Sequence, residues 1–376
     1  MNAMISVDTR MFSERIRRHC MFRFPKLYEW WRWRDWRPER NKASVFYGYD
    51  KLPTKDQFAG GGIIKCQDLE KIFPNSPGSG SILYLVSSAL PHSVIPMVEY
   101  AKRKGLKVVL NQNGVAYPGW ANGRWERINI PYKNVIQSAD FVFYQSQFCK
   151  LSADRYLGEI QAPHMILHNA VDTSFFIPSK ISSEGFRLLL AGSHHHFYRV
   201  RVALETLEKI RRSNKEAKLI IAGRYLWRQN ETDALQEAMN YAATKGIREY
   251  VEFNGAYSQK DAPALLQGCH ILLHTKYNDP CPRLVVEAMS CGLPIAYSAS
   301  GGVPELVGDN AGIGIPAPLD WEEDHPPEAS DLAEAVLKIW GKYSDYAKNA
   351  RMQAVEKFDV GLWIQRHREI FAELCH

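Results

Sequence analysis

The segment NDPCPRLVVEAMSCGLPIAYSASGGVPELV, residues 278–307, combines two acidic residues with a predicted helix entrance. Asp279 stands in a proline-rich turn, and Glu287, eight positions later, falls on the second turn of the helix that follows. Pro280 and Pro282 suit this entrance because an N–H group would have no partner there. The unpaired N–H groups and positive dipole end of such a helix favour an anionic or hydroxyl-rich ligand. The segment therefore predicts a site for a ligand of that kind.

Alternating strands and helices position this segment. A first series runs from ASVFYGYD (43–50) to HMILHNAVD (164–172), and a second begins at FRLLLAGS (186–193). Alternation at this spacing predicts parallel sheets covered by helices on both faces, and 376 residues suffice for two such domains. We therefore expect an α/β fold with two Rossmann-like domains and a cleft between them. Periodicity alone does not place the last helix, GLWIQRHREIFAELC (361–375).

The segment 278–307 resembles the C-terminal signature of the retaining family-4 glycosyltransferases, also called glycosyl transferases group 1. In that signature two acids flank seven residues and precede Ala-Met-x-Cys-Gly-x-Pro and Gly-Gly-x-Pro-Glu. Three further motifs fall in the family's order: GGGIIKCQDL like its glycine loop, HNAVDTSFFIP like its domain connection, and LIIAGR with YVEFNGAYS like two strands near the nucleotide base. The resemblance covers roughly residues 44–376 and implies the GT-B fold, in which two parallel sheets face each other across a cleft.

The resemblance implies a division of the chain into four parts. These are a basic Arg/Trp-rich extension (1–42), an N-terminal acceptor domain (43–172), a C-terminal nucleotide-sugar domain (173–357) and a C-terminal helix that crosses back to the N-terminal domain (358–376).

The resemblance also assigns roles to particular residues. Glu287 corresponds to the acid that hydrogen-bonds the ribose hydroxyls, and Asp279 to the acid that holds the donor sugar near its reacting carbon. Asn113 occupies the place where the family often has a histidine, and it cannot titrate. Asp279 is one methylene shorter than the usual glutamate, and Pro282 replaces a usual glycine. The other donor-binding candidates are Gly61, Gly62, Arg199, Arg201, Arg224, Gly255, Cys281, Pro282, Arg283 and Leu284.

The expected reaction is transfer of a hexose from a nucleoside-diphosphate sugar to a hydroxyl of a carbohydrate or lipid-linked acceptor, in glycan, polysaccharide or glycolipid biosynthesis. Charge builds on the leaving diphosphate, and helix N–H groups with Arg199 and Arg201 can stabilise it. The chain has no Asp-x-Asp cation motif, so we expect neither a metal ion nor a cofactor. The resemblance implies retention, with attack on the face that the phosphate leaves.

Several alternatives stay open at this stage. The chain could be a scaffold that binds a nucleotide sugar without turnover, a sugar-nucleotide epimerase or, if it were much longer, a phosphorylase. Glu287 could be a surface acid and Asp279 a helix cap. Gly60–Gly62 could be only a turn, and His194–His196 fits a polar loop better than a metal site because consecutive residues cannot all face one ion. A last set of residues could form either core packing or a sugar platform: Tyr117, Trp120 and Trp125.

The excess of positive charge lies near the N-terminus. Residues 11–40 hold nine basic and four acidic groups, nine minus four or +5, out of a net +6 for the chain. This segment, interrupted by Pro25 and Pro38, could pack on the domain surface or lie on an anionic membrane. In the membrane alternative four tryptophans sit at headgroup level: Trp30, Trp31, Trp33 and Trp36. Nucleic-acid binding ranks last because no nucleic-acid module accompanies the segment.

The seven cysteines predict reduced thiols, because their number is odd and none is spaced as Cys-x-x-Cys. The chain also has no apolar run long enough for a membrane span and no secretory signal pattern. We therefore expect a cytoplasmic protein, or one bound peripherally at the inner membrane face.

Overall fold

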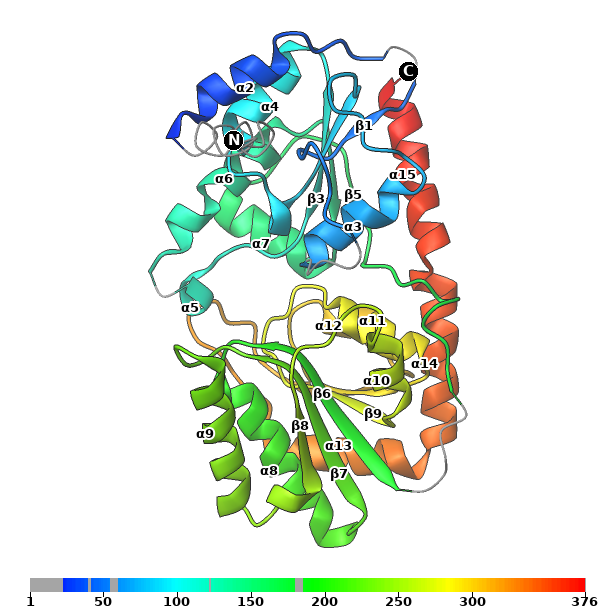
Figure 1. Cartoon of the computed structure of the whole chain (residues 1–376). Coiled ribbons are helices and arrows are strands. Elements are labelled where there is room, and N and C mark those ends of the chain that lie inside the picture. Colours follow the sequence, from blue (N-terminus) through cyan, green and yellow to red (C-terminus); the bar gives the residue numbers. More distant parts are fainter. Residues whose placement is uncertain (1–22, 40–41, 55–59, 122, 180–184, 376) are drawn as a thin grey trace, which may run out of the picture.

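The computed structural model describes residues 23–39, 42–54, 60–121, 123–179 and 185–375. In this part of the chain two parallel sheets lie one above the other, each covered by helices on both faces (Figure 1). The predicted α/β architecture with two Rossmann-like halves is confirmed.

The N-terminal half is built on a five-stranded sheet with the order β1-β2-β3-β4-β5, in which every pair is parallel. Its strands are β1 (Val45–Phe46), β2 (Ile82–Val86), β3 (Lys107–Gln112), β4 (Phe141–Tyr144) and β5 (His164–Ile166). One face packs against α2 (Pro25–Trp33), α4 (Val94–Arg103), α6 (Trp125–Ser138) and α7 (Gln147–Leu157). The other face packs against α3 (Gly61–Glu70) and α15 (Val360–Cys375). Two short turns of helix lie in its loops, η1 (Ser87–Ala89) and α5 (Pro118–Ala121).

The C-terminal half is built on a six-stranded parallel sheet with the order β11-β10-β9-β6-β7-β8. Its strands are β6 (Phe186–His194), β7 (Ala217–Tyr225), β8 (Val251–Asn254), β9 (Ile271–His274), β10 (Ile295–Ala299) and β11 (Gly312–Pro316). One face packs against α8 (Phe197–Ser213), α9 (Glu231–Thr244) and α13 (Ala329–Gly341). The other packs against α10 (Ala262–Gln267), α11 (Arg283–Ser290), α12 (Val303–Val307) and α14 (Tyr343–Phe358).

The order of this second sheet reverses between β6 and β9. From β6 the chain adds β7 and β8 on one side, and then returns to add β9, β10 and β11 on the other. At such a point the loops that follow the two neighbouring strands diverge and leave a crevice at the carboxyl edge of the sheet, where ligands of open α/β sheets bind. The loop after β6 leads into α8, and the loop after β9 leads into α11.

The chain passes between the two halves twice, and the two passages touch. The backbone N–H of Val171 donates to Phe358 O at 2.9 Å, and that of Val360 donates to Val171 O at 2.9 Å. Beside them, the Thr173 hydroxyl donates to the Asp359 carboxylate. After this contact α15 runs along the N-terminal sheet (Figure 1).

His367 fastens α15 to that sheet. Its Nδ1 lies 2.8 Å from the Trp363 carbonyl and its Nε2 lies 3.0 Å from the Tyr84 hydroxyl. Because a carbonyl can only accept, Nδ1 carries the proton and Nε2 accepts from Tyr84. Burial lowers the pKa of His367 to about 3, so the imidazole is neutral in the folded protein.

Acidification is therefore expected to weaken the fold through His367. The unfolded imidazole titrates near its ordinary pKa of about 6.5, so below that pH the unfolded state binds one proton more than the folded state, and stability falls as pH falls. The slope is about 1.4 kcal/mol per pH unit, or about 2 kcal/mol from this residue between pH 6.5 and 5.0. Urea unfolding at pH 7.5 and 5.0 checks this, with His367→Gln expected to narrow the difference by that amount. An equal pH difference in variant and wild type would contradict it.

The Arg/Trp-rich segment is partly buried. Pro25 is the first residue of α2 rather than a helix break, because a proline lacks only an N–H that would be unpaired there. Trp33 and Trp36 are 0% and 4% exposed and stack at 4.1 Å, so the expectation that they sit at headgroup level is wrong. They fill the core between α2 and the sheet instead, whereas Trp30 and Trp31 are about half exposed. Residues 11–22 of this segment lie outside the described residues.

Two further observations concern the described residues only. No helix among them is both long and apolar enough to cross a membrane. The six described cysteines are all free thiols, five of them buried: Cys66, Cys149, Cys269, Cys281, Cys291 and Cys375.

Candidate active site

Asp279 lies in the loop between β9 and α11, at the point where the sheet order reverses. Its Oδ2 is 3.2 Å from the Lys276 ammonium nitrogen and 3.2 Å from His274 Nε2. Its backbone carbonyl accepts from the Gly302 N–H at 2.9 Å, which fixes the loop to the Gly-Gly turn. Pro282 is the residue immediately before α11, with an extended backbone, as a proline at a helix entrance should have.

The charges around Asp279 keep it ionised. Burial alone would raise the pKa of this carboxyl, but Lys276, the hydrogen bond from His274 and the nearby Arg199 together hold it below its usual value. Burial lowers the pKa of His274, which therefore stays neutral and donates from Nε2. The site thus holds one carboxylate facing two cations.

Arg199 and Arg201 point to different surroundings, although both were predicted to reach the diphosphate. Arg199 is 5% exposed and donates to Ser193 O at 2.5 Å, at the end of β6. Arg201 has an exposed side chain and pairs with Glu205 at 3.6 Å, one turn further along α8. Positions two apart on a helix face different directions. The structure therefore brings Arg199 to Asp279 and leaves Arg201 outside the site.

Lys276 was missed by the sequence analysis. It follows β9 directly and lies three residues before Asp279, with which it pairs. Its position at the carboxyl end of a buried strand was the only signal in the sequence, and lysines after strands are too common for that signal to select it.

Glu287 faces Arg283 rather than open space. Arg283 Nε donates to Glu287 Oε1 at 2.9 Å, and its Nη1 donates to Asp68 Oδ2 at 3.0 Å. Asp68 lies on α3 of the N-terminal half, so this guanidinium joins the two halves across the cleft. In the empty protein, the carboxylate predicted to bind ribose is therefore already hydrogen-bonded.

The glycines of the predicted phosphate loop differ in what they allow. A side chain on Gly61, the first residue of α3, would meet no atom within 4 Å. A Cβ on Gly62 would lie 2.7 Å from the Ala89 Cβ, so this glycine is needed for packing against η1. Only Gly61 presents its backbone to free space.

A cavity of about 200 Å³ separates the two halves beside Asp279. Asn113 lines it from the N-terminal half and Lys276 from the C-terminal half. The next residue, Gly114, comes so close to Pro280 that a Cβ would lie 2.9 Å from the proline ring. Asn113 and the Asp279 loop are therefore neighbours across the cleft, as a shared role in the reaction requires.

Three aromatic residues near this cavity have different surroundings. Tyr117 is buried and packs edge-on against Trp321 at 5.2 Å. Trp125 packs against Tyr156, also at 5.2 Å. Trp120 lines the cavity and is 51% exposed. Of the three, only Trp120 offers a free ring to a sugar.

The remaining donor-binding candidates lie at the edges of the site. Cys281 is buried, and its carbonyl accepts from the Asn169 side chain at 2.5 Å. The Leu284 side chain approaches Gly192 in β6. Arg224, at the end of β7, pairs with Glu231 at 2.8 Å. Gly255 is exposed, and its carbonyl accepts from the Gly223 N–H at 3.0 Å.

The triple histidine does not form a metal site. His194 is fully buried, and its Nε2 donates to the Ala222 carbonyl at 3.2 Å. The expectation that all three histidines form a polar loop is therefore wrong for His194, which ends β6. Across the part of the chain that the structure describes, no three or more His, Cys, Asp or Glu side chains are grouped so that they could hold a metal ion.

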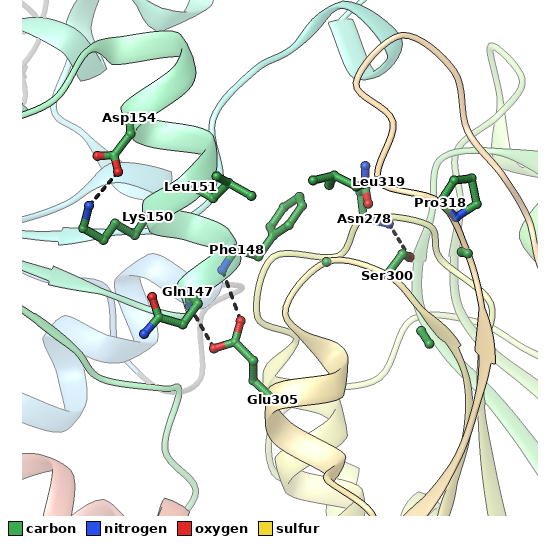
Figure 2. A pocket seen from close by; sticks show the side chains of 13 residues that line it. Gln147, Phe148, Lys150, Leu151, Asp154, Asn278, Ser300, Glu305, Pro318 and Leu319 are labelled. Atoms are coloured by element: carbon green, nitrogen blue, oxygen red, sulfur yellow. Dashed lines mark hydrogen bonds and ion pairs between the residues drawn. The ribbon is translucent and has the colours of Figure 1, made fainter.

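A second, larger hollow of about 560 Å³ lies between α7 and the loops after β10 and β11. Figure 2 shows the Glu305 carboxylate pointing at the first residues of α7, where it accepts from the Gln147 and Phe148 N–H groups at 2.8 and 3.1 Å. Burial would raise the pKa of Glu305, but these bonds and His168 lower it. The acid of the Gly-Gly-x-Pro-Glu turn thus caps a helix of the opposite half. None of the predicted site residues lines this hollow.

Comparison with known proteins identifies the domain that carries this site. Residues 173–353 match the family model described as glycosyl transferases group 1. This span is a group 1 glycosyltransferase domain. It contains Asp279, Glu287 and Arg199, together with the helix α11 that separates the two acids.

Curated relatives of the glycosyltransferase reach beyond that domain. The gpi3 subunit of phosphatidylinositol N-acetylglucosaminyltransferase from Schizosaccharomyces pombe is 21% identical over 305 residues, which is 79% of this chain and 60% of gpi3. The chain thus spans less than two thirds of that relative. A protein of the corresponding enzyme from Homo sapiens is 34% identical over 64 residues, 17% of this chain and 13% of its own length.

Solved structures share the fold of the glycosyltransferase. Alr3699/HepE from Anabaena, in complex with UDP and glucose, has a TM-score of 0.70 at 17% identity and covers 88% of this chain and 100% of its own. Sucrose-phosphate synthase from Thermosynechococcus elongatus has a TM-score of 0.64 at 16% identity, over 83% of this chain and 76% of its own. The predicted GT-B fold is confirmed.

Proposed function

We propose that the chain transfers a hexose from a nucleoside-diphosphate sugar to a hydroxyl group of an acceptor. The observation that carries the proposal is the cluster of Asp279, Lys276 and Arg199 at the sheet reversal, beside the N-terminus of α11. A carboxylate can hold sugar hydroxyls there, while two cations and a helix dipole face the diphosphate. The UDP-glucose complex of Anabaena Alr3699/HepE, a structure of the same fold, also supports a nucleotide-sugar donor.

The leaving group decides which groups act. When the bond between the sugar C1 and the phosphate oxygen breaks, negative charge collects on the diphosphate and positive charge on the sugar ring. Arg199, Lys276 and the α11 N–H groups stabilise the first charge, and they are in place before the reaction begins. Asp279 holds the sugar so that C1 faces the cavity that Asn113 lines.

The proposal includes retention and independence from metal ions. The acceptor oxygen bonds to C1 on the face that the phosphate leaves, and the acceptor proton passes to a phosphate oxygen. Asn113 cannot exchange a proton at neutral pH, so its role is to hydrogen-bond the reactants. Side-chain cations supply the positive charge that a metal would otherwise bring, and the sequence has no Asp-x-Asp pair.

A lipid-linked acceptor at an anionic membrane surface completes the proposal. The gpi3 relative is named for transfer to phosphatidylinositol, a lipid. On this chain, α2 exposes Leu27, Trp30 and Trp31, each about half accessible, with Lys26 exposed among them. Apolar and aromatic side chains beside basic groups favour the interface of an anionic bilayer. The chain would then work peripherally, at the inner membrane face.

Sedimentation with liposomes tests the membrane part. At low salt the protein is expected to pellet with phosphatidylserine vesicles and to remain in solution with phosphatidylcholine vesicles, because the attraction depends on lipid charge. The double variant Trp30→Ser/Trp31→Ser should lose most of this binding. Equal pelleting of variant and wild type would contradict a role for α2.

A donor screen tests the activity itself. Thermal shift and slow donor hydrolysis are measured with UDP-, GDP-, ADP- and dTDP-sugars in the presence of EDTA, for the wild type and Glu287→Ala. Stabilisation and sugar release with one donor, both lost in the variant, would establish the enzyme and name its donor.

A non-catalytic scaffold is the second candidate, favoured by the departures at Asp279, Pro282 and Asn113 from the family pattern. A scaffold would bind a donor without releasing sugar, so binding without any turnover in the same screen, with or without acceptor lipid, would favour it. An epimerase would instead convert the donor into its isomer, which chromatography of the sugar product detects.

A further inference from the structure

Lys65 is a buried cation to which no role has been assigned. It lies on α3 and is 5% exposed. Its ammonium nitrogen reaches back along the helix to the carbonyl of Gly61, at 3.4 Å. A buried ammonium is costly unless an anion compensates it, so the surroundings of Lys65 decide what it does.

No described carboxylate compensates Lys65. The acid nearest on its own helix, Asp68, is taken by Arg283 at 3.0 Å and by Lys71 at 3.2 Å. The other ionisable groups that act on Lys65 are thiols, Cys281, Cys66 and Cys149. Burial raises the pKa of all three, to about 12 for Cys281 and Cys66, so they are uncharged at neutral pH.

Lys65 nevertheless stays mainly protonated. Burial lowers its pKa to about 8, which leaves the ammonium as the major form at pH 7. The empty protein therefore holds a positive charge at the contact between α3 and the α11 entrance, with only a long hydrogen bond to a carbonyl.

The ammonium points to a place where a ligand can enter. Gly61 opens α3, a helix of ten residues, and a Cβ on Gly60 or Gly61 would meet nothing within 4 Å. The first N–H groups of a helix have no partner within it and favour anions. The Asp68–Arg283 pair shows that α3 borders the cleft, opposite α11 (Figure 1). A cation and helix N–H groups thus converge on free space at the cleft.

We propose that Lys65 and the first turn of α3 bind an anionic oxygen group of the donor, a phosphate or a carboxylate, from the side of the cleft opposite Arg199. The proposal rests on the proposed function and adds a binding residue to it. A donor held by Arg199 from the C-terminal half and by Lys65 from the N-terminal half joins the two halves, so its binding favours the closed cleft.

The anionic group has two sources that share one chemistry. The diphosphate is present in every nucleotide sugar, whereas a carboxylate is present only where the sugar is a uronic acid. Isothermal titration separates them with four probes: inorganic pyrophosphate, UDP, UDP-glucose and UDP-glucuronate. Pyrophosphate tests the site without regard to which base the protein prefers.

Lys65→Met removes the charge at nearly constant volume, and Lys71→Met is the matched control, since it removes the same charge from an exposed position of the same helix. Lys65→Met is expected to weaken binding by about 10- to 100-fold, for all four probes if the diphosphate is bound and for UDP-glucuronate alone if a carboxylate is bound. Lys71→Met should change affinity by less than about twofold.

Thermal unfolding of the empty protein separates ligand binding from a structural role. Because Lys65→Met removes an uncompensated buried charge, the variant should melt at or above the wild-type Tm; a lower Tm together with weaker binding would mark Lys65 as a structural residue and overturn the proposal. Unchanged affinity in a folded variant would overturn it while leaving the proposed function intact. Pyrophosphate binding that depends on Lys65, without binding of any nucleotide sugar, would support the anion site and contradict the proposed function.

Discussion

Asp279→Asn is expected to lower kcat for sugar transfer by about 10²- to 10³-fold, the loss seen when a preorganised charged or polar group at a reacting centre is removed. The carboxylate lies between Lys276 and His274, each 3.2 Å from the same oxygen. An amide in its place would leave the buried ammonium without a counter-charge, and its own NH₂ group would donate where the sugar hydroxyls need an acceptor. Initial rates with saturating donor measure the loss.

Two further variants make this result specific. Asp279→Glu restores the acid that the family uses and should retain activity to within about tenfold. Asp331→Asn removes a carboxylate from the exposed surface of α13 and should change nothing measurable. If Asp279→Asn keeps full activity, Asp279 serves only to fix the loop before α11, and the proposed hold on the donor sugar is wrong.

Glu287→Gln is expected to weaken donor binding by about 10- to 100-fold, the worth of a hydrogen bond to a charged group, with a smaller effect on kcat. The carboxylate lies one helix turn beyond Arg283 and on the same side, so it can exchange the guanidinium for ribose hydroxyls. The ribose is remote from the reacting carbon, and loss of its contacts raises KM more than it lowers kcat. Titration with the nucleoside diphosphate alone gives the Kd directly.

The Asp68–Arg283 pair offers a control for this prediction. Asp68→Asn loosens Arg283 from the opposite half without touching Glu287. If Glu287→Gln acts by losing ribose contacts, Asp68→Asn will leave the affinity for the nucleoside diphosphate within a few-fold of wild type. If the two variants weaken binding equally, the effect belongs to the Arg283 bridge and Glu287 does not bind ribose.

Local patterns in the sequence predicted most of the fold. The apolar run SILYLVSSA contains β2, and FRLLLAGS contains β6, because strands buried on both faces must be apolar throughout. The strand β11, GIGIP, was not predicted, since glycine and proline are poor in strands. It forms because all five residues pair with β10, and Gly312 fits where a Cβ would lie 2.1 Å from the Ile295 carbonyl oxygen.

The candidate site divides in the same way. Asp279 and Glu287 could be predicted because both lie in one short segment whose helix entrance sets their spacing. Their partners could not, because Lys276 and His274 follow a strand, and Asp68 comes from the other half of the chain. The choice between Arg199 and Arg201 depended on which face of α8 meets the sheet, and the first turn of a helix does not reveal that in sequence.

The contact between the two chain passages has a consequence for motion. Val171 is bonded on both sides to residues 358–360, so both connections between the halves cross at one place along one edge of the molecule. Two connections fastened together act as a hinge, about which one half swings as a lever. Displacement on such a lever grows with distance from the pivot, so groups far from Val171 separate most on opening. The Gly119 N–H that donates to Trp321 O at 2.8 Å belongs to the loops that would part when the cleft admits its substrates.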